Sequence, residues 1–299
     1  MPTDSPRFTL LLCVKDRLDR LRECLESLRR LQSEATGELL IACDGGPATL
    51  RRDAGSLLEA EGWSSRWLDL PAGGPARARN AALPHARGQL ILFLNDDIRC
   101  EPGLLAAHDR AHRARPGHAV MGNTRWAPEV ITDDFMHWVA HHDSFYYLIP
   151  SPEKATWEYF HTMNLSVDRL WFMEKGARFD ESFPDPAFED TELGYRLCRD
   201  GLQITLAYDA ILYHVHHFRF PEYLAKSRMR GRSARRFLEL YPELTDRILS
   251  EYRWQASRLD GWKGIARRLA GRLDALDVME SRIAREFLAG YHSVSSISS

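Results

Sequence analysis

Short runs of apolar residues alternate with amphipathic segments in the amino-terminal part of the chain. Predicted strands cover residues 8–14, 39–43, 67–70 and 89–94. The unbroken apolar run from Leu90 to Leu94 is typical of a strand buried on both faces of a parallel sheet. The segments between them predict helices, the clearest of which has leucines spaced three and four residues apart: Leu18, Leu21, Leu25, Leu28 and Leu31. This alternation predicts an α/β fold with a doubly wound, mostly parallel sheet.

Polar side chains gather just beyond the ends of these strands. The carboxyl edge of an open α/β sheet is where such folds bind ligands, and helices that begin there favour phosphate. Paired carboxylates suit Mg²⁺ or Mn²⁺ shared with substrate phosphates, although acids in a hydrated turn would look the same. Asp16 is also expected to cap the first helix. The polar residues that follow the strands are Asp16, Arg17, Asp44, Arg79, Asn95, Asp96 and Asp97.

Composition narrows the class of protein. The 299 residues, with 44% hydrophobic and 27% charged side chains, are ordinary for a globular protein, and a net charge of −2 argues against general nucleic-acid binding. The five cysteines lack metal-like spacing, and no stretch is long enough for a membrane span. We therefore expect a cytoplasmic protein with no nucleic-acid partner. The pattern along the chain predicts one domain over residues 1–222 and a helical extension over 223–299.

Four segments in order resemble the family 2 glycosyltransferases, which have the GT-A fold. They are FTLLLCVKDRLDRLRECLESL, ELLIACDGG, GGPARARNAALPHARGQLILFLNDD and FDESFPDPAFEDTELGYRLCRDG. Three positions depart from the family pattern: Asn95 replaces the first acid of Asp-x-Asp, Cys43 replaces one of two acids, and residues 13–15 replace Pro-Thr-Tyr. The resemblance implies a nucleotide-binding half over about 1–100 and an acceptor half over about 101–222.

The resemblance also implies roles for individual residues. Asp97 and His214 would hold Mn²⁺ or Mg²⁺, while Asn164 and Ser166 would lie beside the acceptor. A uridine nucleotide is the most frequent donor in the family. The residues implied to bind the nucleotide sugar are Val14, Asp16, Arg17, Asp44, Arg79, Asn95 and Asp96.

Asp190 has two competing interpretations. It stands at the start of a predicted helix over 189–200, where it could serve only as an N-cap. The resemblance makes it the general base that takes the proton of the acceptor hydroxyl. Glu189 is assigned a catalytic role as an acceptor-binding or orienting carboxylate.

A run of histidines ends a predicted strand over residues 211–217. His214 and His216 would share one face because they are two residues apart. We expect His214 to be the metal ligand, and His216 and His217 to be surface side chains. A zinc site built on these histidines is the alternative, although matching cysteines are missing.

The region after residue 223 is helical in pattern and basic. Residues 226–272 contain 13 Lys or Arg against 5 Asp or Glu. One predicted helix carries an apolar stripe flanked by basic side chains, which suits either peripheral contact with anionic lipid on the inner membrane face or packing against the sheet or a partner. The stripe and its flanks are Trp262, Lys263, Ile265, Arg267, Arg268, Leu269, Arg272 and Leu273.

Together these features predict a metal-dependent inverting glycosyltransferase that moves a sugar from a nucleotide-diphosphate sugar, with UDP favoured, to a saccharide or other hydroxyl acceptor. A sugar nucleotidyltransferase is one alternative, but it needs a glycine-rich loop where this chain reads CVKDR. A non-catalytic nucleotide-binding or membrane-associated relative is the other.

Overall fold

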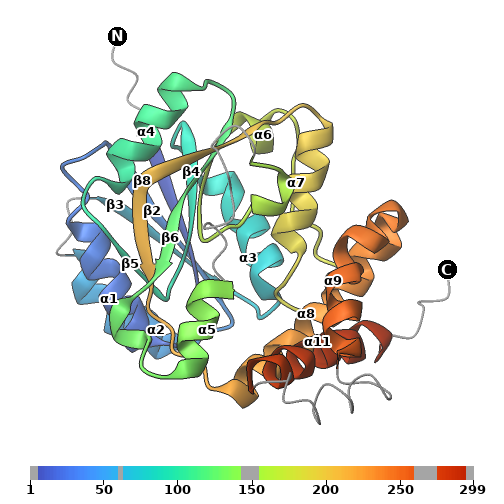
Figure 1. Cartoon of the computed structure of the whole chain (residues 1–299). Helices are drawn as coiled ribbons and strands as arrows, with labels where there is room; N and C mark the ends of the chain where they lie inside the picture. Colours follow the sequence, from blue (N-terminus) through green and yellow to red (C-terminus); the bar gives the residue numbers. More distant parts are fainter. Residues whose placement is uncertain (1–5, 60–62, 143–154, 259–274, 294–299) are drawn as a thin grey trace. The chain divides into compact units, whose positions relative to one another are not determined.

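The computed structural model describes residues 6–59, 63–142, 155–258 and 275–293 (Figure 1). The chain divides into two compact units. The first contains residues 1–181 and 190–217, and the second contains residues 182–189 and 218–299. The domain boundary predicted at residue 222 stays a prediction.

Strands and helices alternate in the first unit up to β4, as the hydrophobic pattern predicts. The strands are β1 (Phe8–Val14), β2 (Gly37–Asp44), β3 (Ser64–Leu70), β4 (Leu90–Asn95), β5 (Ile98–Cys100), β6 (Ala119–Trp126), β7 (Asn164–Asp168) and β8 (Ile204–His214). The helices are α1 (Leu18–Arg29), α2 (Ala48–Glu59), α3 (Gly74–Ala82), α4 (Leu104–Ala114), α5 (Asp134–His142), α6 (Leu170–Met173) and α7 (Glu189–Arg199), with short 3₁₀ turns η1 (Leu83–His85), η2 (Pro128–Val130) and η4 (Trp157–Tyr159).

All eight strands belong to one sheet in the order β3-β2-β1-β4-β7-β6-β8-β5. The β3-β2-β1-β4 half is parallel throughout. β7 runs antiparallel to both β4 and β6, and β5 runs antiparallel to β8. The predicted α/β class is therefore confirmed, with two reversed strands in the half of the sheet where the sequence pattern is least regular.

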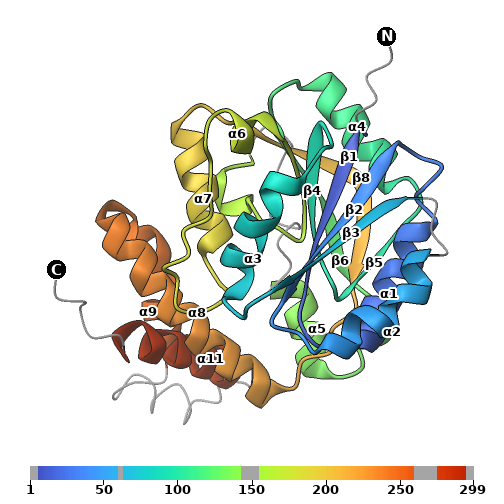
Figure 2. The same cartoon turned by 180° about the vertical axis from the view of Figure 1, so that it is seen from behind.

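Helices cover both faces of the sheet (Figures 1 and 2). Because strand side chains alternate, Leu10 and Leu12 of β1 pack into the core under α1, α2 and α4, whereas Leu11 packs into the core under α3, α6 and α7. For this reason β1, β2 and β4 are buried on both faces, whereas β3 at the end of the sheet is largely exposed.

The first turn of α1 differs from the sequence-based expectation. The residue at the N-cap position is Arg17, and no side chain caps the helix. Asp16 is exposed. The predicted capping role of Asp16 is therefore wrong, because the helix begins one residue too late for its carboxylate to serve the first turn.

The second unit is helical. Its elements are α8 (Phe220–Leu240), η5 (Pro242–Leu244), α9 (Thr245–Ser257) and α11 (Ala275–Ser293). Two glycines let α8 and α11 approach at backbone distance: a Cβ on Gly231 would lie 1.9 Å from the carbonyl oxygen of Phe287, and one on Gly290 would lie 1.9 Å from that of Arg228. The Tyr252 ring stacks on Phe287 with centroids 3.7 Å apart.

The predicted lipid-binding stripe over residues 262–273 lies outside the described residues. Within the described part of the chain, no helix combines the length and the apolar character that crossing a bilayer requires.

Candidate functional site

One end of the sheet gathers most of the polar residues singled out by their sequence positions. β1, β2 and β4 are parallel and in register, with Cys13 opposite Asn95 and Val14 opposite Cys43. Their carboxyl ends therefore meet at one edge. β8 reaches the same edge at His214, which pairs with Ile98 two residues beyond the Asp96 position.

The two aspartates after β4 are buried and held by arginines from α1 and the turn before it. Arg17 Nη2 lies 3.0 Å from Asp96 Oδ1 and 3.3 Å from Asp97 Oδ2, and Arg20 Nη1 lies 3.6 Å from Asp97 Oδ2. Asp96 is 5% exposed and Asp97 is 7% exposed. Burial, and then the neighbouring charge of Asp97, raise the pKa of Asp96 to about 6. Two buried carboxylates therefore lie side by side, and positively charged groups must balance them.

Two histidines from the end of β8 face Asp97. His214 Nε2 lies 3.4 Å from Asp97 Oδ1, and His216 Nδ1 lies 3.8 Å from Asp97 Oδ2. Burial opposes ionisation of Asp97, but the positive charges of His214 and the arginines outweigh it and lower its pKa. The edge of the Trp126 ring contacts His214 at a centroid distance of 4.6 Å.

The surface position predicted for His216 is wrong. It is 8% exposed and contacts Arg20 as well as Asp97, and it lies two residues beyond the end of β8 at His214. His217, by contrast, lies at the surface, where its side chain is 37% exposed and lies 3.3 Å from Asp133.

The donor atoms at Asp97 and His214 fit a divalent cation. A carboxylate oxygen and an imidazole nitrogen converge at 3.4 Å, and both are ligand types that Mn²⁺ accepts. Within the described residues, no three His, Cys, Asp or Glu side chains form a cluster that could hold a metal. Such a pair matches sites in which substrate phosphates and water complete the coordination.

Asp190 lies in the first turn of α7 and is anchored to the segment before β7. Asp190 Oδ2 accepts hydrogen bonds from the Thr162 backbone N–H at 3.1 Å and its hydroxyl at 3.3 Å, and Oδ1 accepts from the Thr191 N–H at 2.8 Å. His161 Nδ1 lies 3.9 Å from Oδ2. The printed contacts do not support the alternative N-cap role, because an N-cap accepts from amides two or three residues on, whereas Asp190 accepts from the next residue and lies within α7.

The register of β7 relates Asp190 to the metal-ligand candidates. Asn164 at the start of β7 pairs with Leu94 at the end of the antiparallel β4. Thr162 precedes Asn164 by two residues, and Asp96 follows Leu94 by two. The carboxylate that Thr162 holds is therefore at the same end of the sheet as Asp96.

The acceptor-site role predicted for Asn164 and Ser166 stays a prediction, and in the structure both residues have partners inside the protein. Both side chains are 0% exposed. His108 on α4 bonds Ser166 Oγ at 2.8 Å and Asn164 Oδ1 at 2.9 Å, and His112 bonds Ser166 Oγ at 2.7 Å. The two residues lie inside the paired part of β7, and their side chains point into the core.

Other predicted donor-binding residues have structural partners. Asp44 accepts hydrogen bonds from the N–H groups of Gly73 at 2.7 Å and Gly74 at 3.0 Å, which fixes the amino terminus of α3. Arg79 is 5% exposed, and its guanidinium lies 5.4 Å from the centroid of the Phe179 ring. These contacts make Asp44 and Arg79 supports of the α3 end of the site, while their contact with a donor stays a prediction.

The remaining predicted donor-binding residues differ in what they expose. The Val14 side chain is 3% exposed and belongs to the core, so it offers only its backbone to a ligand. Asp16 is exposed, and Asn95 is partly buried at the end of β4.

Glu189, for which a catalytic role is predicted, begins α7 and is 5% exposed.

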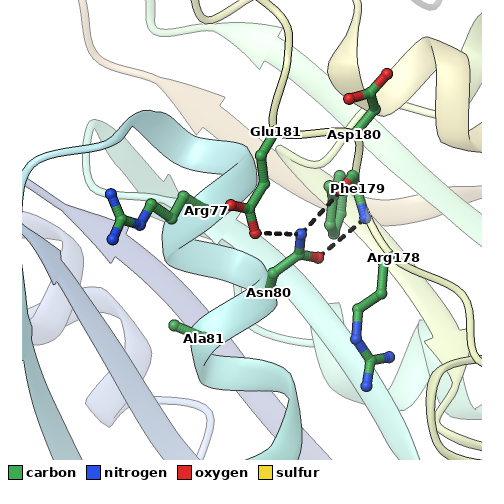
Figure 3. Close-up of a pocket in the computed structure, with 7 residues that line it drawn as sticks. All are labelled: Arg77, Asn80, Ala81, Arg178, Phe179, Asp180 and Glu181. Atoms are coloured by element: carbon green, nitrogen blue, oxygen red, sulfur yellow. Dashed lines mark hydrogen bonds between the residues drawn. The ribbon is translucent and has the colours of Figure 1, made fainter.

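A hollow of about 610 Å³ borders α3 beside the segment that leads toward α7 (Figure 3). Asn80 fixes its wall: its amide donates to the Phe179 carbonyl oxygen at 2.9 Å and to Glu181 at 2.9 Å, and its oxygen accepts from the Phe179 N–H at 2.9 Å. The lining residues are Arg77, Asn80, Ala81, Arg178, Phe179, Asp180 and Glu181.

Sequence reasoning did not select Arg20, Thr162 or His216 for the site. Arg20 lies three residues after Arg17 and so on the same side of α1, which is a spacing that could have identified it. Thr162 acts mainly through its backbone N–H, for which no sequence signal exists.

Comparison with known families decides the class of the protein. Residues 9–175 match the family model for glycosyl transferase family 2. The chain belongs to this family. It is therefore a glycosyltransferase, and the fold described above is the one that this enzyme class has.

Solved structures agree in fold. The mannosyltransferase PcManGT from Pyrobaculum calidifontis, in complex with GDP-Man and Mn²⁺, is 16% identical with a TM-score of 0.68, over 97% of this chain and 87% of that chain. S. aureus TarS 1–349 in complex with UDP-GlcNAc is 12% identical with a TM-score of 0.55, over 96% of this chain and 91% of that chain. No curated protein matches the sequence.

Proposed function

We propose that this glycosyltransferase is a metal-dependent inverting enzyme that transfers a sugar from a nucleoside-diphosphate sugar to an acceptor hydroxyl. One observation supports the proposal above the others: the Asp97–His214 pair and the Asp190 carboxylate occupy the same end of the sheet. The Asp97–His214 pair suits a cation that holds a diphosphate, and the Asp190 carboxylate suits the role of proton acceptor. Inverting transfer needs both functions in one site.

Asp190 is the general base of this mechanism. As the acceptor oxygen forms a bond to the anomeric carbon, the bond from that carbon to the diphosphate oxygen breaks, and the hydroxyl proton passes to the Asp190 carboxylate. The hydrogen bonds from Thr162 and Thr191 orient the carboxylate before the reaction. Because attack and departure occur on opposite sides of the carbon, one carboxylate is sufficient and the configuration inverts.

Asp97 and His214 would hold the metal. A bound Mn²⁺ or Mg²⁺ would stabilise the charge that develops on the departing diphosphate. Arg17 and Arg20, which lie against Asp96 and Asp97, bring permanent positive charge to the same region. Guanidinium groups bind phosphate oxygens well, so these side chains would orient the donor.

The nucleotide base of the donor stays a prediction, with UDP favoured. PcManGT is bound to GDP-Man and a TarS structure to UDP-GlcNAc, so both bases belong in a donor panel. We expect Mn²⁺ to stimulate nucleotide release from one member of such a panel. A complete absence of release would favour the non-catalytic alternative.

Peripheral membrane contact also stays a prediction. Two basic side chains of α8 have acidic partners inside the second unit, since Arg228 Nε lies 3.1 Å from Glu286 and Arg235 Nε lies 2.8 Å from Glu239. Paired charge attracts anionic lipid less than free charge does, so these two arginines would contribute little to a lipid contact.

Asp190→Asn tests the proposed mechanism. Asn keeps the shape and accepts a hydrogen bond but takes no proton, so we expect turnover to fall by about 10²–10⁴-fold with donor binding unchanged. Asp200→Asn, which alters an exposed carboxylate just beyond the other end of α7, is the control and should leave turnover unchanged. Turnover near the wild-type rate in Asp190→Asn would refute the assignment of the base.

A further inference from the structure

The backbone around Asp97 is fixed to the end of β8. Ile98 pairs with His214 across the β5–β8 ladder, and the Val215 N–H donates to the Asp97 carbonyl oxygen at 2.9 Å. Because the main chains are held together, the rotation of the Asp97 side chain is the freedom that remains. The outer torsion of an aspartate has no sharp preference of its own, so neighbouring groups decide which way each carboxylate oxygen points.

The two carboxylate oxygens of Asp97 face different groups. Oδ1 lies 3.4 Å from His214 Nε2. Oδ2 lies 3.3 Å from Arg17 Nη2 and 3.6 Å from Arg20 Nη1. Guanidinium groups are strong, directional donors to carboxylates, so their position at Oδ2 keeps Oδ1 turned toward His214. The ligand pair proposed for the metal therefore depends on what holds the guanidinium groups in place.

Arg20 is held by His216. Its Nη1 contacts His216 Nδ1 at hydrogen-bond distance, and because a guanidinium group only donates, Nδ1 is the acceptor. Nδ1 also lies 3.8 Å from Asp97 Oδ2, which is too long for a direct hydrogen bond. The Arg20 N–H groups therefore connect the imidazole to the carboxylate. His216 is 8% exposed and Asp97 is 7% exposed, so this connection is made inside the protein.

The position of Arg20 in α1 is unfavourable for a cation. Arg20 is the third residue of the helix, in the turn where the helix dipole is positive. The contacts that offset this repulsion come from outside the helix, from Asp97 after β4 and from His216 after β8. All these residues belong to the sheet unit. The placement of Arg20 is thus explained by the carboxylate and the imidazole that it joins.

The two histidines after β8 meet this network with different atoms. His214 presents Nε2 to Asp97 Oδ1, whereas His216 presents Nδ1 to Arg20. Their ring centroids lie 5.9 Å apart, and their planes differ by 49°. They are therefore not equivalent partners of one cation, although their spacing of two residues would place them on one face of a regular strand.

We propose that His216 is a positioning residue for Asp97, acting through Arg20. The proposal rests on the proposed function, since it concerns the metal pair of that site. His216 holds the Arg20 guanidinium at Oδ2, and Oδ1 is thereby directed toward His214 Nε2. The two atoms proposed as metal ligands then point at each other before any cation binds. His216 itself does not touch the metal, the donor or the reacting atoms.

The proposal predicts a loss of metal affinity without the loss of a ligand. Groups that orient a metal ligand typically contribute about 10- to 100-fold to affinity, so the Kd for Mn²⁺ should rise by about that factor in His216→Ala. His216→Asn places an amide oxygen near the position of Nδ1, where it can accept from Arg20. Its Kd should therefore stay within about threefold of wild type, which a merely destabilising substitution would not explain.

Arg20→Lys tests the other end of the connection. Lysine keeps the positive charge but lacks the planar fork that reaches two acceptors, so we expect Mn²⁺ to bind about 10-fold more weakly. If Arg20 acted through its charge alone, the lysine variant would bind Mn²⁺ as wild type does. Arg22→Lys, at an exposed position of the same helix, and His217→Ala, whose side chain contacts Asp133 at the surface, are the matched controls.

Each variant is titrated with Mn²⁺ alone, and electron paramagnetic resonance of the free ion gives the Kd. Pulsed measurements then detect any nitrogen bound directly to Mn²⁺. We expect this nitrogen signal in wild type and in His216→Ala, and its loss in His214→Ala. Thermal unfolding shows whether each variant is folded, and should His216→Ala fold poorly, Arg20→Lys carries the test.

Two results would overturn the proposal and leave the metal site standing. One is a Kd within about twofold of wild type in both His216→Ala and Arg20→Lys. The other is a nitrogen signal that disappears in His216→Ala and persists in His214→Ala, because His216 would then be the ligand. A wild-type protein that binds no Mn²⁺ would instead refute the metal dependence of the proposed function, and this inference with it.

Discussion

Ser166→Ala examines the buried network between α4 and β7. The Ser166 hydroxyl bonds both His108 at 2.8 Å and His112 at 2.7 Å, and all three side chains are at most 5% exposed. Alanine lacks the hydroxyl that both histidines share, so His108 Nδ1 and His112 Nε2 stay buried and lose this hydrogen bond. Each such group costs about 1–3 kcal/mol, so we expect the free energy of unfolding to fall by about 2–4 kcal/mol.

The network also makes stability depend on pH. Asn164 Oδ1 only accepts hydrogen bonds, so His108 Nε2 donates to it and the neutral His108 Nδ1 accepts from Ser166. Burial lowers the pKa of His108 to about 4, whereas the unfolded value is about 6.5. Below about pH 6.5 the unfolded chain binds the proton before the folded one does, so the free energy of unfolding decreases as the pH is lowered. The loss from His108 alone is about 2 kcal/mol at pH 5.

Urea unfolding of wild type, Ser166→Ala and Ser64→Ala at pH 7 and pH 5 measures both effects. Ser64 is an exposed strand serine, so its variant should match wild type within about 0.5 kcal/mol. A loss below about 1 kcal/mol in Ser166→Ala at pH 7 would refute the energetic argument. Wild-type stability that is unchanged or higher at pH 5 would refute the assignment of His108 as neutral.

Two further predictions concern the metal and the helical unit. Asp97→Ala should abolish Mn²⁺ binding measured by electron paramagnetic resonance, whereas Asn95→Asp should preserve or strengthen it because it adds negative charge beside the cation; weaker binding in Asn95→Asp would contradict the assumed geometry. Gly231→Ala should lower stability by about 1–3 kcal/mol or more through the 1.9 Å clash with Phe287. Gly55→Ala, with open space around its Cβ, is the control for thermal unfolding and should be neutral or stabilising.

The fold was readable from hydrophobic pattern where the pattern is regular. Up to β4, each strand and helix is marked by the pattern of its own residues. Burial of β1, β2 and β4 on both faces gives these strands mostly apolar sequences. β6 and β7 are recognised less easily, because Asn123, Thr124, Asn164 and Ser166 interrupt their apolar character. Asn123, Asn164 and Ser166 form hydrogen bonds with residues distant in the chain, and such pairing cannot be predicted from local sequence.

The sequence predicted site residues well where polar residues follow the end of a strand. It predicted them less well where the residues lie within a strand. Asp96 and Asp97 lie where β4 leaves the sheet, and the structure brings them together with Arg17 and His214. Asn164 lies inside the ladder opposite Leu94 and therefore points into a core. A match to a family motif gives the place of a residue in the chain, but the ladder decides which way its side chain points.

The charge balance at Asp96 and Asp97 favours an uncharged side chain at position 95 when no metal is bound. Two arginines already face the two aspartates, and the raised pKa of Asp96 shows that a buried acid here ionises with difficulty even with that compensation. A third carboxylate at position 95 would add to this repulsion whenever no metal is bound, since like charges at close range disfavour ionisation. Asparagine keeps a hydrogen-bonding side chain at the strand end without that cost.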